Sequence, residues 1–136
     1  MIQAVKTTYP IRVQYEDTDF SGFVYHANYI KFCERARSDF TRQKGIDQNA
    51  YFTGPDKIAF VVRRMDCNFL RPARFGDDLI VETEFLEIKG ARFEAFQQVK
   101  RGQDVLFTAA VTAALVDGQG RPKRCPPEML KAFTTP

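Results

Sequence analysis

Hydrophobic residues recur with the period of an α-helix from Tyr29 onward. They follow the i, i+3, i+4, i+7, i+11 series of one buried helix face, and polar residues fill the opposite side. The apolar series is Tyr29, Phe32, Cys33, Ala36 and Phe40. We therefore expect the longest helix of the chain here, with Asn28 as its cap and its end at Gly45.

On both sides of this helix the pattern changes to the two-residue alternation of β-strands. The expected strands are Thr8–Tyr15, Ile58–Arg71, Asp78–Ile88, Arg92–Arg101 and Val105–Val116. The alternation shifts near Arg63 and Arg64, which indicates a bulge there. Tight turns join the last three strands, so the sheet is antiparallel, and the fold class is α+β with one long helix packed on the sheet. We also expect short helices around residues 47–52 and 126–133.

Two of the strands are apolar on both faces. Val105–Val116 therefore reads as a central strand, and Ile58–Val62 shares its character. One helix can cover only one face of the sheet, and a monomer would expose the other. Large exposed apolar patches usually mark an interface, so we expect a homodimer.

Composition narrows the class of protein. The chain has 136 residues, 44% hydrophobic and 27% charged, with a net charge of +3 that is too small to indicate nucleic-acid binding. Its cysteines, Cys33, Cys67 and Cys125, are scattered and its one histidine is His26, so we expect no metal site and reduced thiols. We find no signal peptide, and the longest apolar run is shorter than the ~20 residues of a membrane helix. We expect a cytoplasmic protein.

The loop before the long helix carries the candidate chemistry. Asp17 and Asp19 precede a flexible point at Gly22, and the helix follows. Free amides at a helix start carry partial positive charge and favour a developing negative oxygen. A carboxylate beside such donors has the minimum equipment for attacking a carbonyl. Two carboxylates one residue apart on extended backbone point to opposite sides, so we expect only one of them to act.

Three stretches resemble the hot-dog-fold acyl-CoA thioesterases, and the similarity covers nearly the whole chain. They are Y-E-D-T-D-F-S-G-F-V-Y-H-A-N-Y with E-R-A-R after it, A-F-V-V-R-R-M and R-P-A-R-F-G-D-D-L. The nearest branch is the bacterial thioesterases associated with the Tol-Pal cell-envelope system, which are related to 4-hydroxybenzoyl-CoA thioesterase. The resemblance implies one hot-dog domain over residues 1–136, with a long central helix wrapped by a curved five-stranded antiparallel sheet. It also implies a homodimer or homotetramer with active sites at the subunit interface.

The resemblance also implies roles for particular residues. Asp19 matches the catalytic carboxylate, acting as general base or as nucleophile through a mixed anhydride. The backbone amide of His26 matches the donor that polarises the thioester carbonyl, and the His26 side chain is a second candidate for catalysis. Tyr25, Asn28 and Tyr29 are candidates for substrate binding.

Lys89 matches part of a basic cluster that contacts the coenzyme A phosphates in the hydroxybenzoyl branch. Gly90 and Ala91 stand where that branch has basic residues, and Arg92 is a nearby substitute. The implied reaction is hydrolysis of an acyl-CoA thioester to a free acid and coenzyme A. It needs no cofactor beyond the coenzyme A of the substrate, and an acyl carrier protein is a possible alternative carrier.

Two other functions remain open from the sequence. One is an acyl-thioester dehydratase or hydratase of the same fold, whose histidine and acid would be His26 and Glu34. The other is a non-catalytic acyl-binding or scaffold protein of the cell-envelope machinery.

Overall fold

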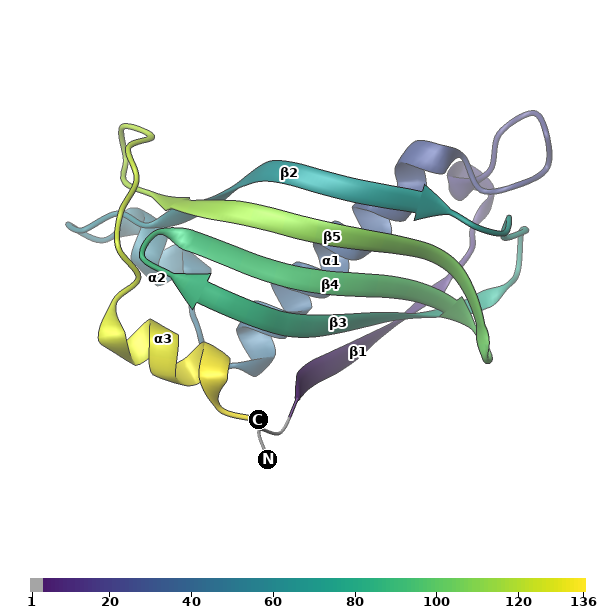
Figure 1. Cartoon of the computed structure of the whole chain (residues 1–136). Coiled ribbons are helices and arrows are strands. Elements are labelled where there is room, and N and C mark those ends of the chain that lie inside the picture. The colour runs from purple at the N-terminus through teal and green to yellow at the C-terminus, as the bar shows by residue number, and fades with distance from the viewer. Residues whose placement is uncertain (1–3) are drawn as a thin grey trace.

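A computed structural model describes residues 4–136, which form one five-stranded antiparallel sheet and three α-helices (Figure 1). The strands are β1 (Val5–Arg12), β2 (Ala59–Phe69), β3 (Asp78–Lys89), β4 (Arg92–Arg101) and β5 (Asp104–Val116). The helices are α1 (His26–Gln43), α2 (Gln48–Thr53) and α3 (Pro127–Thr134). The order of strands across the sheet is β1-β3-β4-β5-β2, which leaves β1 and β2 as the edges.

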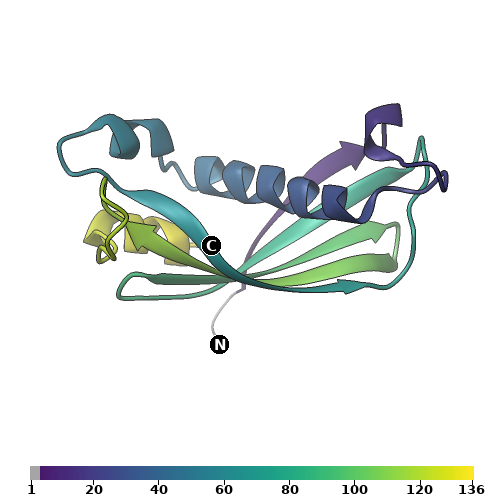
Figure 2. The same cartoon turned by 90° about the horizontal axis from the view of Figure 1, so that it is seen from above.

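Helix α1 crosses one face of the curved sheet, as Figure 2 shows from above. The apolar face expected from the sequence is the buried face of the helix. Beneath it, alternate residues of β3 and β4 point inward and are buried, while the residues between them are partly or fully exposed. The expected long helix on an antiparallel sheet is therefore confirmed.

The last four predicted strands agree closely with the observed ones, and two details are confirmed. Strand β5 lies between β4 and β2, as its apolar character indicated. The register of β2 against β5 shifts between Val62 and Arg64, at the expected bulge.

The prediction for the first strand is wrong at both ends. Strand β1 begins at Val5 and stops at Arg12, and Tyr15–Asp17 form a turn of 3-10 helix instead of continuing the strand. The Asp17 carboxylate accepts the Gln14 amide at 2.8 Å and closes this turn. Tyr15 is consequently 80% exposed and stacks on Phe75, with ring centroids 4.4 Å apart.

The predicted start of the long helix is also wrong. Helix α1 begins at His26, with Tyr25 as its cap in extended conformation, and Asn28 lies inside the first turn. The Asn28 side chain does not cap the helix, because its amide nitrogen donates to the carbonyl of Asp17 at 2.9 Å.

The end of α1 is sealed by an aromatic cluster. Phe133 of α3 stacks on Phe40, with centroids 5.9 Å apart, and on Phe85 of β3, at 5.8 Å. Phe40 and Phe133 are almost completely buried. The short terminal helix therefore completes the core at this end of the sheet (Figure 1).

The edge strand β2 exposes several large apolar side chains. Val61 and Val62 are 49% and 45% exposed. The outward positions of β5 hold small residues instead, among them Thr108, Ala110 and Thr112. Part of the apolar surface expected from the sequence therefore lies along the β2 edge, and the outward positions of β5 contribute little to it.

Candidate active site

The loop between β1 and α1 is tied to the connection between β2 and β3. The Val24 amide donates to the Ala73 carbonyl at 2.9 Å, and the Val13 amide to the Asp77 carbonyl at 3.0 Å. Phe23 and Arg74 form a further antiparallel bridge. These main-chain contacts fix the loop at the end of the molecule where α1 begins (Figure 1).

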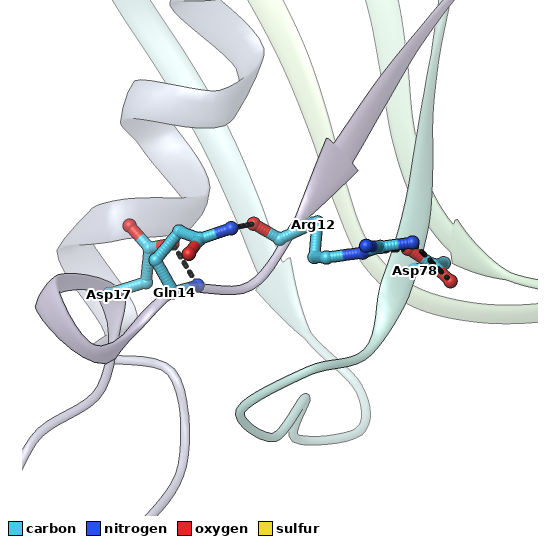
Figure 3. Close-up of polar contacts among 4 residues, drawn as sticks. All are labelled: Arg12, Gln14, Asp17 and Asp78. Carbon is cyan, nitrogen blue, oxygen red and sulfur yellow. Dashed lines mark hydrogen bonds and ion pairs between the residues drawn. The ribbon is translucent and has the colours of Figure 1, made fainter.

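Asp17 is a structural residue of this loop. Its side chain is buried and accepts the Gln14 amide, next to the bond from the Gln14 side chain to the Arg12 carbonyl and the Arg12–Asp78 ion pair (Figure 3). Its carbonyl accepts the Tyr25 amide at 2.8 Å as well as the Asn28 side chain. Asp17 therefore joins the turn to the helix start.

Asp19 is exposed, in contrast to Asp17. Its Oδ1 accepts the Ser21 amide at 2.8 Å and also the Ser21 hydroxyl. The bonds from Ser21, with a contribution from the nearby His26, hold the pKa of the Asp19 carboxyl below its ordinary value of 3.8. Near neutral pH Asp19 is a charged carboxylate facing solvent.

The first amides of α1 are open to a ligand. In the part of the chain that the structure describes, the amides of His26 and Ala27 have no hydrogen-bond acceptor, whereas the Asn28 amide donates to the Tyr25 carbonyl at 2.8 Å. Amides at a helix start also carry the positive end of the helix dipole. They form a preorganised donor for an oxygen that gains negative charge.

The aromatic side chains around the helix start are exposed. The His26 ring lies 4.5 Å from that of Tyr25 and 6.0 Å from that of Phe69, measured between centroids. Tyr25 and His26 are both exposed, and the Asp19 carboxylate is near enough to His26 for the two charges to interact, so the three residues share one open surface.

Tyr29 and Asn28, the other candidates for substrate binding near the helix start, are buried. The Tyr29 hydroxyl accepts the Ala73 amide at 2.9 Å, and its ring stacks on Phe107 with centroids 5.3 Å apart. Burial raises the pKa of Tyr29. In a single chain both residues support the loop and the helix start from below.

Lys89 lies far from these residues. Strand β3 begins near the loop and ends at Lys89, and its 12 residues span about 36 Å at roughly 3.3 Å per residue. Lys89 lines an open pocket on the outer face of the sheet with three arginines. The arginines are Arg63, Arg64 and Arg92.

Sequence reasoning missed Arg63 and Arg64 as members of this basic pocket. They reach it from the β2 bulge, two strands away from the β3–β4 turn that carries Lys89 and Arg92. The shift in alternation that marks the bulge in the sequence was the signal that could have pointed to these two arginines.

Among residues 4–136 no three His, Cys, Asp or Glu side chains are grouped closely enough to hold a metal ion. Within the same range, no helix combines the length and apolar character needed to cross a membrane.

The chain is similar in sequence to curated acyl-CoA thioesterases. Over 127 residues the chain is 39% identical to the acyl-CoA thioesterase YbgC of Haemophilus influenzae, covering 93% of each chain. It is 35% identical to the acyl-CoA thioester hydrolase YbgC of Escherichia coli O6:H1, covering 92% of this chain and 93% of the relative.

Solved structures match the fold. A probable thioesterase from Bartonella henselae superimposes with a TM-score of 0.85 at 41% identity, covering 89% of this chain and 99% of the other. A 1,4-dihydroxy-2-naphthoyl-CoA thioesterase from Synechocystis reaches 0.86 at 20% identity, covering 94% and 95%, which supports the hot-dog fold alone. The model of the thioesterase-like superfamily matches residues 13–133, and the chain belongs to this superfamily.

Proposed function

We propose that this protein hydrolyses an acyl-CoA thioester, with Asp19 as the acting carboxylate and the His26 amide as the donor to the thioester carbonyl. The observation that carries the assignment is the contrast within the loop. Asp17 is buried and bonded to the main chain, whereas Asp19 is charged, exposed and near the open amides of α1. The thioesterase superfamily and the acyl-CoA-hydrolysing relatives support the reaction class.

In the proposed reaction the thioester carbonyl oxygen accepts a hydrogen bond from the His26 amide. As the carbonyl carbon becomes tetrahedral, its oxygen gains negative charge, which the helix start stabilises. Asp19 either removes a proton from an attacking water or attacks the carbon itself and forms a mixed anhydride that water then opens. In both routes the carbon–sulfur bond breaks, the thiol of coenzyme A leaves with a proton, and one water is consumed. Water supplies the new oxygen of the acid in the general-base route, whereas in the anhydride route that oxygen comes from water or from Asp19, depending on which carbon the water attacks.

We also propose that the protein works as a homodimer joined through the β2 edges. Two-fold symmetry pairs adjoining edge strands antiparallel, so the start of one β2 lies beside the end of the other. The basic pocket lies beside the first half of β2, and Phe69, next to His26, lies at the end of the strand. Pairing would therefore bring Lys89 and its arginines alongside the partner's Asp19 loop, where they would contact the coenzyme A phosphates.

The three cysteines are free, which supports the proposal of a cytoplasmic protein. The dehydratase alternative gains no support within one chain. Glu34 lies about 12 Å along α1 from His26 at 1.5 Å per residue, so the two do not form an acid–histidine pair there.

Thiol release from short, aromatic and long acyl-CoAs tests the proposal. We expect Asp19→Asn to lose roughly 10²-fold to 10⁴-fold in kcat/KM, because positioned acid–base groups contribute about that much. Asp17→Asn is the matched control, since it changes the other aspartate and leaves the reacting group in place. It should lower stability more than turnover per folded enzyme.

If none of the acyl-CoAs releases thiol, the proposed hydrolysis is wrong, and the alternative of a non-catalytic binding or scaffold protein stands. If Asp17→Asn were the more damaging variant and both stayed folded, the roles of the two aspartates would be reversed. Water labelled with ¹⁸O identifies the nucleophilic route when water opens the anhydride at the Asp19 carbon, because a single turnover then places label in the Asp19 carboxyl and unlabelled oxygen in the acid.

A further inference from the structure

A polar chain of hydrogen bonds runs through the core beneath α1 and ends on an arginine. Gln97 of β4 is fully buried, and its Nε2 donates to the Cys33 carbonyl at 2.9 Å and to the Thr83 hydroxyl at 3.0 Å. Its Oε1 accepts Nη1 of Arg37 at 2.9 Å. Buried polar groups are costly unless all are bonded, so this chain holds the Arg37 guanidinium in one position.

In the described part of the chain the Arg37 guanidinium forms no direct ion pair, although the charge of Glu34 is near enough to raise its pKa against the effect of burial. None of the ion pairs within residues 4–136 includes Arg37, and Gln97 is neutral. A guanidinium has five N–H donors, and within residues 4–136 the Arg37 guanidinium donates one hydrogen bond, to Gln97. Burial lowers the pKa of Arg37, a sign of the cost of holding its charge away from water.

The remaining donors of Arg37 face a cavity. No buried side-chain nitrogen or oxygen in the described chain lacks a partner, so the unbonded nitrogens of Arg37 must reach solvent. The residue lines a cavity of about 280 Å³ between α1 and the inner face of β2, β4 and β5. The strands contribute apolar walls, among them Phe60, Val62 and Phe93, whereas the helical side is polar and includes Glu34.

We infer that this cavity binds the far end of the acyl group and that Arg37 selects acyl groups ending in a carboxylate. The inference rests on the proposed function and on the proposed dimer. Phe60 and Val62 belong to the start of β2, which the dimer places beside the partner's Asp19 loop. A charged guanidinium with free, preorganised donors matches a carboxylate better than any neutral end group.

Glu34 works against this ligand. It is exposed, it lines the same cavity, and its charge repels a carboxylate. Glu34→Gln should therefore improve the hydrolysis of a carboxylate-ended substrate by roughly two- to fivefold, the range of an exposed charge pair. This variant tests the cavity without disturbing the buried hydrogen bonds.

The test compares kcat/KM for glutaryl-CoA and pentanoyl-CoA, whose five-carbon acyl groups end in a carboxylate and a methyl group. Arg37→Met keeps an apolar stem and removes the charge. We expect it to lower the ratio of glutaryl-CoA to pentanoyl-CoA roughly tenfold to a hundredfold, as for a lost charged hydrogen bond. Arg35→Gln is the matched control, because Arg35 is exposed on the same helix and lies outside the cavity. The ratio of glutaryl-CoA to pentanoyl-CoA should be unchanged in this variant.

An unchanged ratio in folded Arg37→Met would overturn the inference, while thiol release by the wild type would keep the proposed function. Should Arg37→Met fail to fold, an unchanged ratio in Glu34→Gln would overturn it equally. If Arg37→Met instead weakens the dimer in sedimentation and leaves the ratio intact, the guanidinium pairs with a second copy and not with substrate. If no acyl-CoA is cleaved, calorimetry compares the affinities of the wild-type protein for glutarate and pentanoate. Equal affinities would reject the inference.

Discussion

The two ends of α1 are built for different purposes. At the C-terminal end the last carbonyls are bonded, with the Lys44 amide donating to the Phe40 carbonyl at 3.1 Å and the Gly45 amide to the Arg42 carbonyl at 2.9 Å. Gly45 has a positive φ of 77°, which suits a residue that ends a helix. Phe40 beside it is sealed under Phe133.

At the N-terminal end the first amides of the helix are left without acceptors in the described chain, and the surrounding side chains are exposed. One end of the helix therefore contributes stability, and the other keeps its polar groups ready for a ligand. The comparison predicts that substitutions at the sealed end change unfolding, and substitutions at the open end change turnover.

The largest effect should come from Phe133→Ala at the sealed end. It removes a ring that is fully buried between Phe40 and Phe85, so we expect the free energy of unfolding to fall by about 3–5 kcal/mol. Urea unfolding measures the loss, and turnover per folded molecule should remain near wild type. A fall in turnover without a loss of stability would break the comparison.

A comparable effect, now on catalysis, should come from His26→Pro. Proline is tolerated in the first turn of a helix but lacks the N–H that we propose contacts the carbonyl oxygen. We expect kcat to fall about 10²-fold or more, and His26→Ala, which keeps the amide, to retain a substantial fraction of it.

Circular dichroism and oligomer size must match wild type for the His26 comparison to count. If alanine is as inactive as proline, the imidazole itself takes part in catalysis, and Asp19 acts as a member of an aspartate–histidine pair.

The smallest effect should be a shift of the pH profile in Ser21→Ala. The pKa of Asp19 is lowered in the folded protein, so activity that needs its charged form is present at neutral pH and is lost only as pH falls below the ordinary 3.8. Removing the Ser21 hydroxyl raises the Asp19 pKa and moves this acid limb to higher pH, while the bond from the Ser21 amide remains.

Thr18→Ala is the control for the pH profile, because the Thr18 hydroxyl donates to the Tyr15 carbonyl and does not contact Asp19. An acid limb that stays in place in Ser21→Ala would show that Asp19 does not set it.

The sequence predicted those parts of the fold that depend on periodicity. The buried face of α1 and the bulge in β2 follow from local patterns of apolar side chains, since burial is what creates those patterns. The start of α1 could not be found this way. It depends on the Asn28 side chain reaching the Asp17 carbonyl, a contact across a turn that no periodicity records.

The candidate site shows the same division. Asp19 and His26 are close in sequence and were predicted together, whereas Arg63 and Arg64 join Lys89 only through the order of strands in the sheet. Gln97 left a signal that was overlooked. It occupies an inward position of β4 between Ala95 and Val99, where alternation calls for an apolar residue.

The proline in strand β1 limits how far the sheet can grow. Pro10 lies in an edge strand, where a proline turns its missing donor toward solvent, so this edge offers an incomplete row of hydrogen bonds to another chain. A protein with two equally good edges can add copies without end and form a filament. In the proposed dimer the two β2 edges are paired with each other and only the β1 edges, with Pro10, remain open, which would limit the addition of further copies.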